Sequence, residues 1–101
     1  ISIYKNKHTI ELNKHRRNIL IIKPIVGTIN IYIFNPKHAS NIINKPLSII
    51  KKWGIKITLS SDELLVISPE WYYAYETYQD TILSFTEGDT YFTYLFNLLR
   101  Q

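Results

Sequence analysis

Cysteine and methionine are absent from this chain of 101 residues, and only three glycines occur in it. Without cysteine the protein has no disulfide framework, no thiol nucleophile and no zinc-finger spacing. Long apolar runs are also absent. The longest aliphatic stretches, residues 19–22 and 64–67, have four residues each, whereas a membrane-spanning helix needs about 20. No cleavable signal pattern is seen. We therefore expect a soluble protein or a component of an assembly, without a membrane partner.

The sequence motifs of common enzyme classes are missing. Each glycine stands alone, so the chain has no phosphate-binding glycine loop, no dinucleotide-binding motif and no nucleophile elbow. The three histidines lie in basic surroundings, which favours exposed loop residues over metal ligands. The acidic residues flank expected turns and helix ends, where carboxylates serve local capping. We therefore expect no enzymatic activity, no metal, no cofactor and no small-molecule substrate.

Acidic residues are rare in the first half of the chain. Residues 1–57 hold eleven lysines and arginines against one acid, a net charge of +10, whereas residues 58–101 hold one arginine against seven acids, a net charge of −6. A strongly positive half attracts polyanions and speeds their association. The alternative is a solvated basic face in a lysine-rich proteome. Because the acidic half would repel a polyanion, we expect any nucleic acid to bind one end of the protein.

The first 68 residues predict a series of short β-strands, because isoleucines alternate with polar residues or form short β-branched runs. Pro24 is expected to end the third strand, since proline cannot donate to a sheet ladder, and Gly27 permits the reversal that follows. Residues 47–53 are ambiguous, although Ile49, Ile50 and Trp53 fit one helical turn. The predicted strands are 1–4, 9–12, 18–23, 28–35, 55–59 and 63–68.

One long helix is predicted over residues 69–87. Ser68 and Pro69 suit the cap and the first helical position, Gly88 suits the stop, and an apolar stripe follows helical spacing. A last strand is predicted over 90–100. These elements predict an α+β fold, a mostly antiparallel sheet covered by one helix, in a single domain of residues 1–101. The last strand is alternatively the start of a second domain. The stripe consists of Trp71, Tyr75, Tyr78, Ile82 and Phe85.

Two stretches of the sequence resemble the universal family of large-subunit ribosomal protein L6. Residues 18–33 resemble the strand, turn and strand of that family's first domain, and Lys23, Gly27 and Thr28 match its turn. Residues 77–92 resemble the end of the family's helix and the strand that follows it. The similar positions in this second stretch are Thr77, Ile82, Leu83, Glu87, Gly88, Thr90 and Phe92.

The resemblance implies a structural component of the large ribosomal subunit, with ribosomal RNA and neighbouring ribosomal proteins as partners. Isoleucine, lysine, asparagine, tyrosine and phenylalanine make up 47 of the 101 residues. Their codons are rich in A and T, which indicates an A+T-rich genome such as that of an organelle, a parasite or a virus. We combine the two observations into the hypothesis of a mitochondrially encoded ribosomal protein that functions in the mitochondrial matrix.

The RNA contacts expected under this hypothesis are cations in or beside loops, which would neutralise phosphates with little regard to base identity. A guanidinium pair at a hairpin tip would bind phosphate oxygens best. Two alternatives stay open. One is a non-enzymatic interaction module of viral or immunity type that uses the acidic, tyrosine-rich helix with Glu76 and Asp80; the other is a small nuclease. The predicted RNA-binding residues are Arg16, Arg17, Lys14, Lys5, Lys7, Lys37, Lys51 and Lys52.

Overall fold

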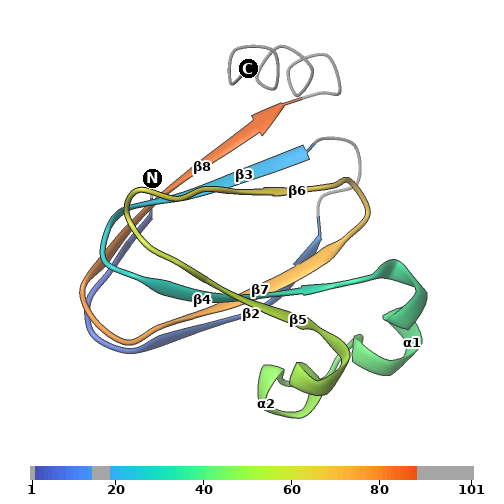
Figure 1. Ribbon diagram of the computed structural model, residues 1–101. Coiled ribbons are helices and arrows are strands. Elements are labelled where there is room, and N and C mark those ends of the chain that lie inside the picture. Colours follow the sequence, from blue (N-terminus) through green and yellow to red (C-terminus); the bar gives the residue numbers. More distant parts are fainter. Residues whose placement is uncertain (1, 15–18, 89–101) are drawn as a thin grey trace.

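The protein is a sandwich of two antiparallel sheets in the part of the chain that its computed structural model describes, residues 2–14 and 19–88 (Figure 1). The β8 sheet has the strand order β1-β8-β3-β6, and the β7 sheet has the order β2-β7-β4-β5. All neighbouring strands pair antiparallel. The strands are β1 (Ser2–Tyr4), β2 (His8–Lys14), β3 (Ile19–Val26), β4 (Ile29–Phe34), β5 (Ile55–Leu59), β6 (Leu65–Ile67), β7 (Tyr72–Thr77) and β8 (Thr81–Gly88).

The main core lies between the two sheets. Along β4, Ile29 and Ile31 point into this core, as the alternation of the strand requires. Burial raises the pKa of the Tyr75 hydroxyl, whose oxygen lies 2.7 Å from that of Tyr4, so the two phenols satisfy each other by one hydrogen bond. The fully assembled core explains why the isoleucine-rich strands fold as two layers. Its buried members are Leu20, Ile22, Ile29, Ile31, Leu59, Ile67, Tyr73, Tyr75 and Leu83.

A second, smaller core lies on the other face of the β7 sheet. Residues 35–54 connect β4 to β5 and form a helical cap made of η1 (Pro36–His38), α1 (Ala39–Ile42), α2 (Leu47–Ile50) and η2 (Lys51–Trp53). The cap lies on the side of the β7 sheet that faces away from the β8 sheet (Figure 1). Its residues Ile42, Leu47 and Ile50 pack with residues from the outer face of the sheet, which are Tyr32, Phe34 and Ala74.

The cap closes tightly at its end. A Cβ atom at Gly54 would lie 2.6 Å from the ring of Phe34, so only glycine fits there without displacing a ring that is fully buried. The backbone N–H of Leu47 donates to the Glu11 carboxylate at 2.8 Å, which ties α2 to β2. These contacts hold the cap to the sandwich and thereby position its exposed side chains.

The predicted α+β fold with a helix over residues 69–87 is wrong. This segment forms β7 and β8, joined by a turn, and Glu70 has a φ of +74°, which is incompatible with a helix beginning at Pro69. Trp71, Tyr75 and Phe85 from the expected helical stripe do lie in or against the core between the sheets. Tyr78, however, is exposed. The aromatic and threonine content of the segment favours strands, and this preference prevails over the helical spacing.

Most of the other expected elements are confirmed. Strands form close to the ranges predicted in the first 68 residues, and residues 47–53 are helical, as α2 and η2. Strand β3 continues past Pro24 to Val26, contrary to expectation, with an irregular register opposite β8. Gly27 has a φ of +87° and makes the expected reversal. The strand predicted over 90–100 lies outside the described residues. None of the helices that the structure describes is long and apolar enough to cross a bilayer.

Candidate nucleic-acid interface

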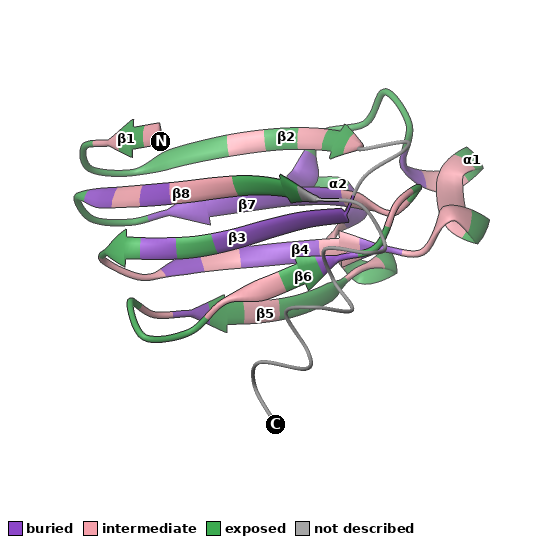
Figure 2. Ribbon diagram, turned by 90° about the horizontal axis from the view of Figure 1, so that it is seen from above, coloured by how far each residue is buried: buried purple, intermediate pink, exposed green. Residues whose placement is uncertain are grey.

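The predicted RNA-binding residues lie at two ends of the sandwich. Lys5 and Lys7 occupy the turn between β1 and β2, whereas Lys14 ends β2 at the opposite end, where Figure 2 also shows α1. Lys37, Lys51 and Lys52 belong to the helical cap. Arg16 and Arg17 lie outside the described residues. The structure therefore separates Lys5 and Lys7 from the other described members of the set.

Two of these lysines are ion-paired within the chain. The Lys14 ammonium lies 2.9 Å from the Glu70 carboxylate, and this hydrogen bond raises the pKa of Lys14. The Lys51 ammonium lies 3.2 Å and 3.3 Å from the two carboxylate oxygens of Glu76. Both pairs join a cation of the first half of the sequence to an acid of the second half. Folding thus neutralises part of the charge division that the linear sequence shows.

The Glu76 pair is the more buried of the two. Glu76 is 7% exposed on β7, and burial alone would raise the pKa of its carboxyl group. Hydrogen bonds from Lys51 and Tyr78 outweigh the burial, so the pKa of Glu76 is lowered from its usual value. The carboxylate therefore stays charged and fastens the cap to the β7 sheet.

The cap segment remains positive despite the Lys51 pair. Residues 35–56 contain five lysines and neither aspartate nor glutamate. Lys37, Lys45 and Lys52 are exposed, and their ammonium groups form no ion pair with any residue in the described ranges 2–14 and 19–88. Three free ammonium groups on one short segment make this end of the sandwich attractive to phosphate groups.

An exposed aromatic ring lies among these lysines. The Trp53 side chain is 37% exposed. Its ring centroid is 5.3 Å from that of His38, with an interplanar angle of 41°, and the Lys52 ammonium lies 5.7 Å from the Trp53 ring. The two short 3₁₀ turns η1 and η2 bring these residues together. A ring of this kind beside free cations is suited to stacking on nucleic-acid bases while the cations contact phosphates.

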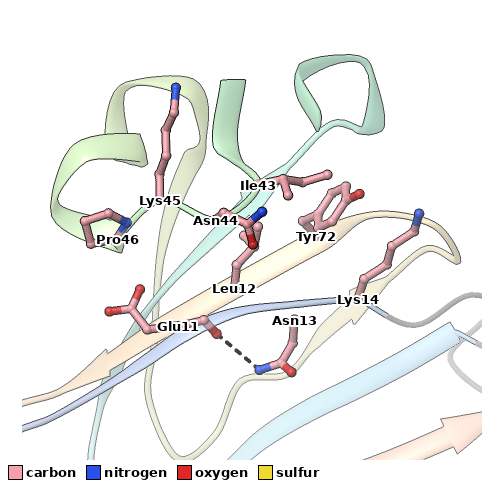
Figure 3. Close-up of a pocket in the computed structure, with 9 residues that line it drawn as sticks. All are labelled: Glu11, Leu12, Asn13, Lys14, Ile43, Asn44, Lys45, Pro46 and Tyr72. Carbon is pink, nitrogen blue, oxygen red and sulfur yellow. Dashed lines mark hydrogen bonds between the residues drawn. The ribbon is translucent and has the colours of Figure 1, made fainter. Parts of the chain in front are cut away.

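A groove of about 770 Å³ lies between the end of β2 and the loop that joins α1 to α2 (Figure 3). The Lys14 ammonium lies 5.0 Å from the centroid of the Tyr72 ring at one side of the groove. Asn44 has a φ of +61°, a conformation that asparagine tolerates better than most residues. The lining consists of Glu11, Leu12, Asn13, Lys14, Ile43, Asn44, Lys45, Pro46 and Tyr72.

Glu11 is the one carboxylate among the residues that line the groove, and it is engaged by the Leu47 N–H. Figure 3 shows Glu11 and Lys14 at opposite edges of the groove, while the Lys45 side chain extends away from the floor formed by Leu12 and Asn13. The groove therefore combines an apolar and aromatic wall with two amide side chains and a free ammonium group at its rim.

Sequence reasoning missed four residues of this interface: His38, Lys45, Trp53 and Tyr72. The run Lys51-Lys52-Trp53-Gly54 holds a signal for the tryptophan, because basic residues interleaved with an aromatic are typical of single-strand binding. Tyr72 gave no such signal, since it was assigned to a helix. Within residues 2–14 and 19–88, the structure holds no group of three or more histidine, aspartate or glutamate side chains placed to bind a metal ion.

Comparison with known proteins gives no significant match to a family model, a curated protein or a solved structure.

Proposed function

We propose that this protein is a non-enzymatic RNA-binding protein and that the helical cap is its RNA-binding surface. The observation that carries the proposal is the exposed Trp53 ring between His38 and Lys52, on a segment with five lysines and no acids. Ribosomal RNA is the partner that the sequence resemblance implies. The surface has the two components that single-strand binding uses, cations for the backbone and a flat ring for the bases.

The mechanism is electrostatic first and stacking second. Lys37 and Lys52 neutralise phosphates and release condensed counterions, so the affinity falls as salt rises. Trp53 then stacks on an unpaired base, which adds binding energy that depends little on sequence because every base has a π-face. Lys51 contributes less, since its ammonium group is held by Glu76. Base identity is accordingly of minor importance.

The ribosomal and mitochondrial parts of the proposal rest on the sequence. The stretch 18–33 forms a strand, a turn at Gly27 and a second strand, as the resemblance implies, although β3 and β4 belong to different sheets. The stretch 77–92 does not have the expected helix end, because its described part forms the end of β7, a turn and β8. The assignment to a mitochondrial large subunit therefore depends on the first stretch and on the composition.

The alternative of an interaction module depended on an acidic, tyrosine-rich helix, and that surface does not form. Glu76 is buried against Lys51 rather than exposed. Asp80 lies in the turn before β8 and accepts a hydrogen bond of 3.1 Å from the backbone N–H of Asn6. The two carboxylates expected to meet a partner are thus engaged within the chain.

The test measures fluorescence anisotropy of an unstructured RNA of about 20 nucleotides across a KCl series. The double variant Lys37→Gln/Lys52→Gln is expected to weaken binding and to reduce the slope of log K against log salt by about 1.4, at about 0.7 per lost phosphate contact. The matched control is Lys5→Gln/Lys7→Gln, which removes the same charge at the opposite end of the sandwich and should leave the affinity within about twofold of wild type. Equal effects of the two doubles, or no binding by the wild type, would overturn the proposal.

A further inference from the structure

We propose that the groove between β2 and the α1–α2 loop accepts one unpaired nucleotide of RNA, with its base against the Tyr72 wall and its phosphate at Lys45. This inference rests on the proposed function and assigns it a second contact site, on the cap but separate from Trp53 in its lining residues. It also makes the protein selective for single-stranded over double-stranded RNA.

The size and the walls of the groove suit a nucleobase. A volume of about 770 Å³ lies within the range of about 300 to 1,000 Å³ that is usual for small-ligand sites. Leu12, Ile43, Pro46 and Tyr72 supply apolar and aromatic surface against which the face of a base can pack. Because Lys14 lies at the Tyr72 ring and is itself held by Glu70, the ring is braced before a ligand arrives.

The polar groups at the groove match the edge of a base and a phosphate. The Asn44 side chain is exposed and makes no hydrogen bond with any described residue, so its amide offers a donor and an acceptor together. Asn13 donates to the Glu11 carbonyl at 3.1 Å and keeps its side-chain oxygen as an acceptor. The free Lys45 ammonium at the rim supplies the positive charge for the phosphate (Figure 3).

The groove discriminates against a duplex because a base within a duplex is stacked on both faces and paired at its edge. Its face becomes available to Tyr72 only when the nucleotide is unpaired, as in loops and bulges. The lysines of the cap, by contrast, contact phosphates of either form. Loss of the groove should therefore change the preference between the two forms, whereas loss of a cap lysine should weaken both alike.

The experiment compares the binding of a single-stranded RNA and of a hairpin with the same composition and a closed four-nucleotide loop. The first carries 2-aminopurine, whose fluorescence reports stacking. Tyr72→Leu and Lys45→Gln are each expected to weaken single-strand binding about five- to tenfold and hairpin binding by less than about twofold. Asn44→Gly removes the amide yet suits the positive φ, so it changes the groove without straining the loop. It should reduce the single-strand preference about threefold.

Lys37→Gln is the control, and it should weaken both RNAs by a similar factor. Circular dichroism confirms that each variant is folded at the assay temperature. The proposal is overturned if wild type binds both RNAs with equal affinity, if Tyr72→Leu leaves the preference unchanged, or if 2-aminopurine fluorescence does not respond to Tyr72. Such results with intact, salt-dependent RNA binding would remove the groove and keep the proposed function, whereas absence of any RNA binding would remove both.

Discussion

The outer faces of the two sheets differ, although both consist of isoleucine-rich alternating strands. On the β7 sheet, Tyr32 and Phe34 point away from the main core and are still buried, because the helical cap covers them. On the β8 sheet, Ile3 is 68% exposed and Val26 is 47% exposed. The comparison teaches that the alternation decides which face a side chain takes, while burial on the outer face depends on what a distant segment supplies. It also shows why the basic residues of residues 35–54 are held in place: the same segment fills a core on its inner side.

The largest effect is expected from a cavity in the small core of the cap. Ile50→Ala should lower the free energy of unfolding by about 2 to 4 kcal/mol, because Ile50 is fully buried there. Ile22→Ala, in the core between the sheets, is the matched control and should cost at least as much. Urea unfolding measures both. RNA anisotropy then separates them, since only Ile50→Ala loosens the binding surface of the molecules that remain folded. Wild-type affinity of folded Ile50→Ala would show that the cap does not hold the RNA-binding residues.

A smaller effect is expected from the ion pair that joins the cap to the β7 sheet. The pKa of Glu76 is lower in the folded protein than in the unfolded chain. Its carboxylate therefore contributes stability that is complete above the unfolded pKa, about 4.3, and is lost as pH falls through the lower folded pKa. Glu76→Gln should flatten the decline of the melting temperature in this acidic range.

The control for the ion pair is Glu70→Gln, which removes the exposed partner of Lys14. This variant should keep the slope of the wild type, because an exposed ion pair contributes little to stability. Thermal melts from about pH 7 to pH 3 measure the three profiles. An unchanged slope in Glu76→Gln would contradict the role assigned to the buried pair.

The smallest effect is expected on the open face of the β8 sheet. Ile3→Thr should change the free energy of unfolding by no more than about 0.5 kcal/mol, since the side chain is largely exposed and threonine suits a strand. Urea unfolding of Ile3→Thr beside wild type makes the measurement. A loss of more than about 1 kcal/mol would indicate that this face is covered in solution, and the contrast between the two sheets would then disappear.

The strands were largely predictable and the long helix was not, for one physical reason. Trp71, Tyr75 and Phe85 recur at helical spacing, but Tyr73, Tyr75 and Thr77 also recur with the period of two that a strand requires. The turn between β7 and β8 contains neither glycine nor proline, so the usual sign of a hairpin is missing there. When both periods fit, the strand preference of aromatic and β-branched residues is the better guide.

The candidate site was only partly predictable, because folding combines distant segments. The cationic cap follows from the composition of residues 35–56, and Lys37 and Lys52 were among the predicted contacts. The groove draws on β2, the α1–α2 loop and Tyr72, which lie far apart in the sequence. The linear division of charge was also misleading, since it did not show that Lys14 and Lys51 meet Glu70 and Glu76.

The route of the chain through the cap has a consequence for how the protein can change. Ile33 is paired with Ile55, so the 20 residues numbered 35–54 leave and re-enter the β7 sheet at adjacent points. Extending such a connection costs little closure entropy, and loops on a rigid scaffold tolerate insertion and replacement. Recognition is therefore encoded in a contiguous cassette. Exchanging that cassette would redirect the protein to another ligand while every strand keeps its neighbours, provided that the new segment again shields Tyr32 and Phe34.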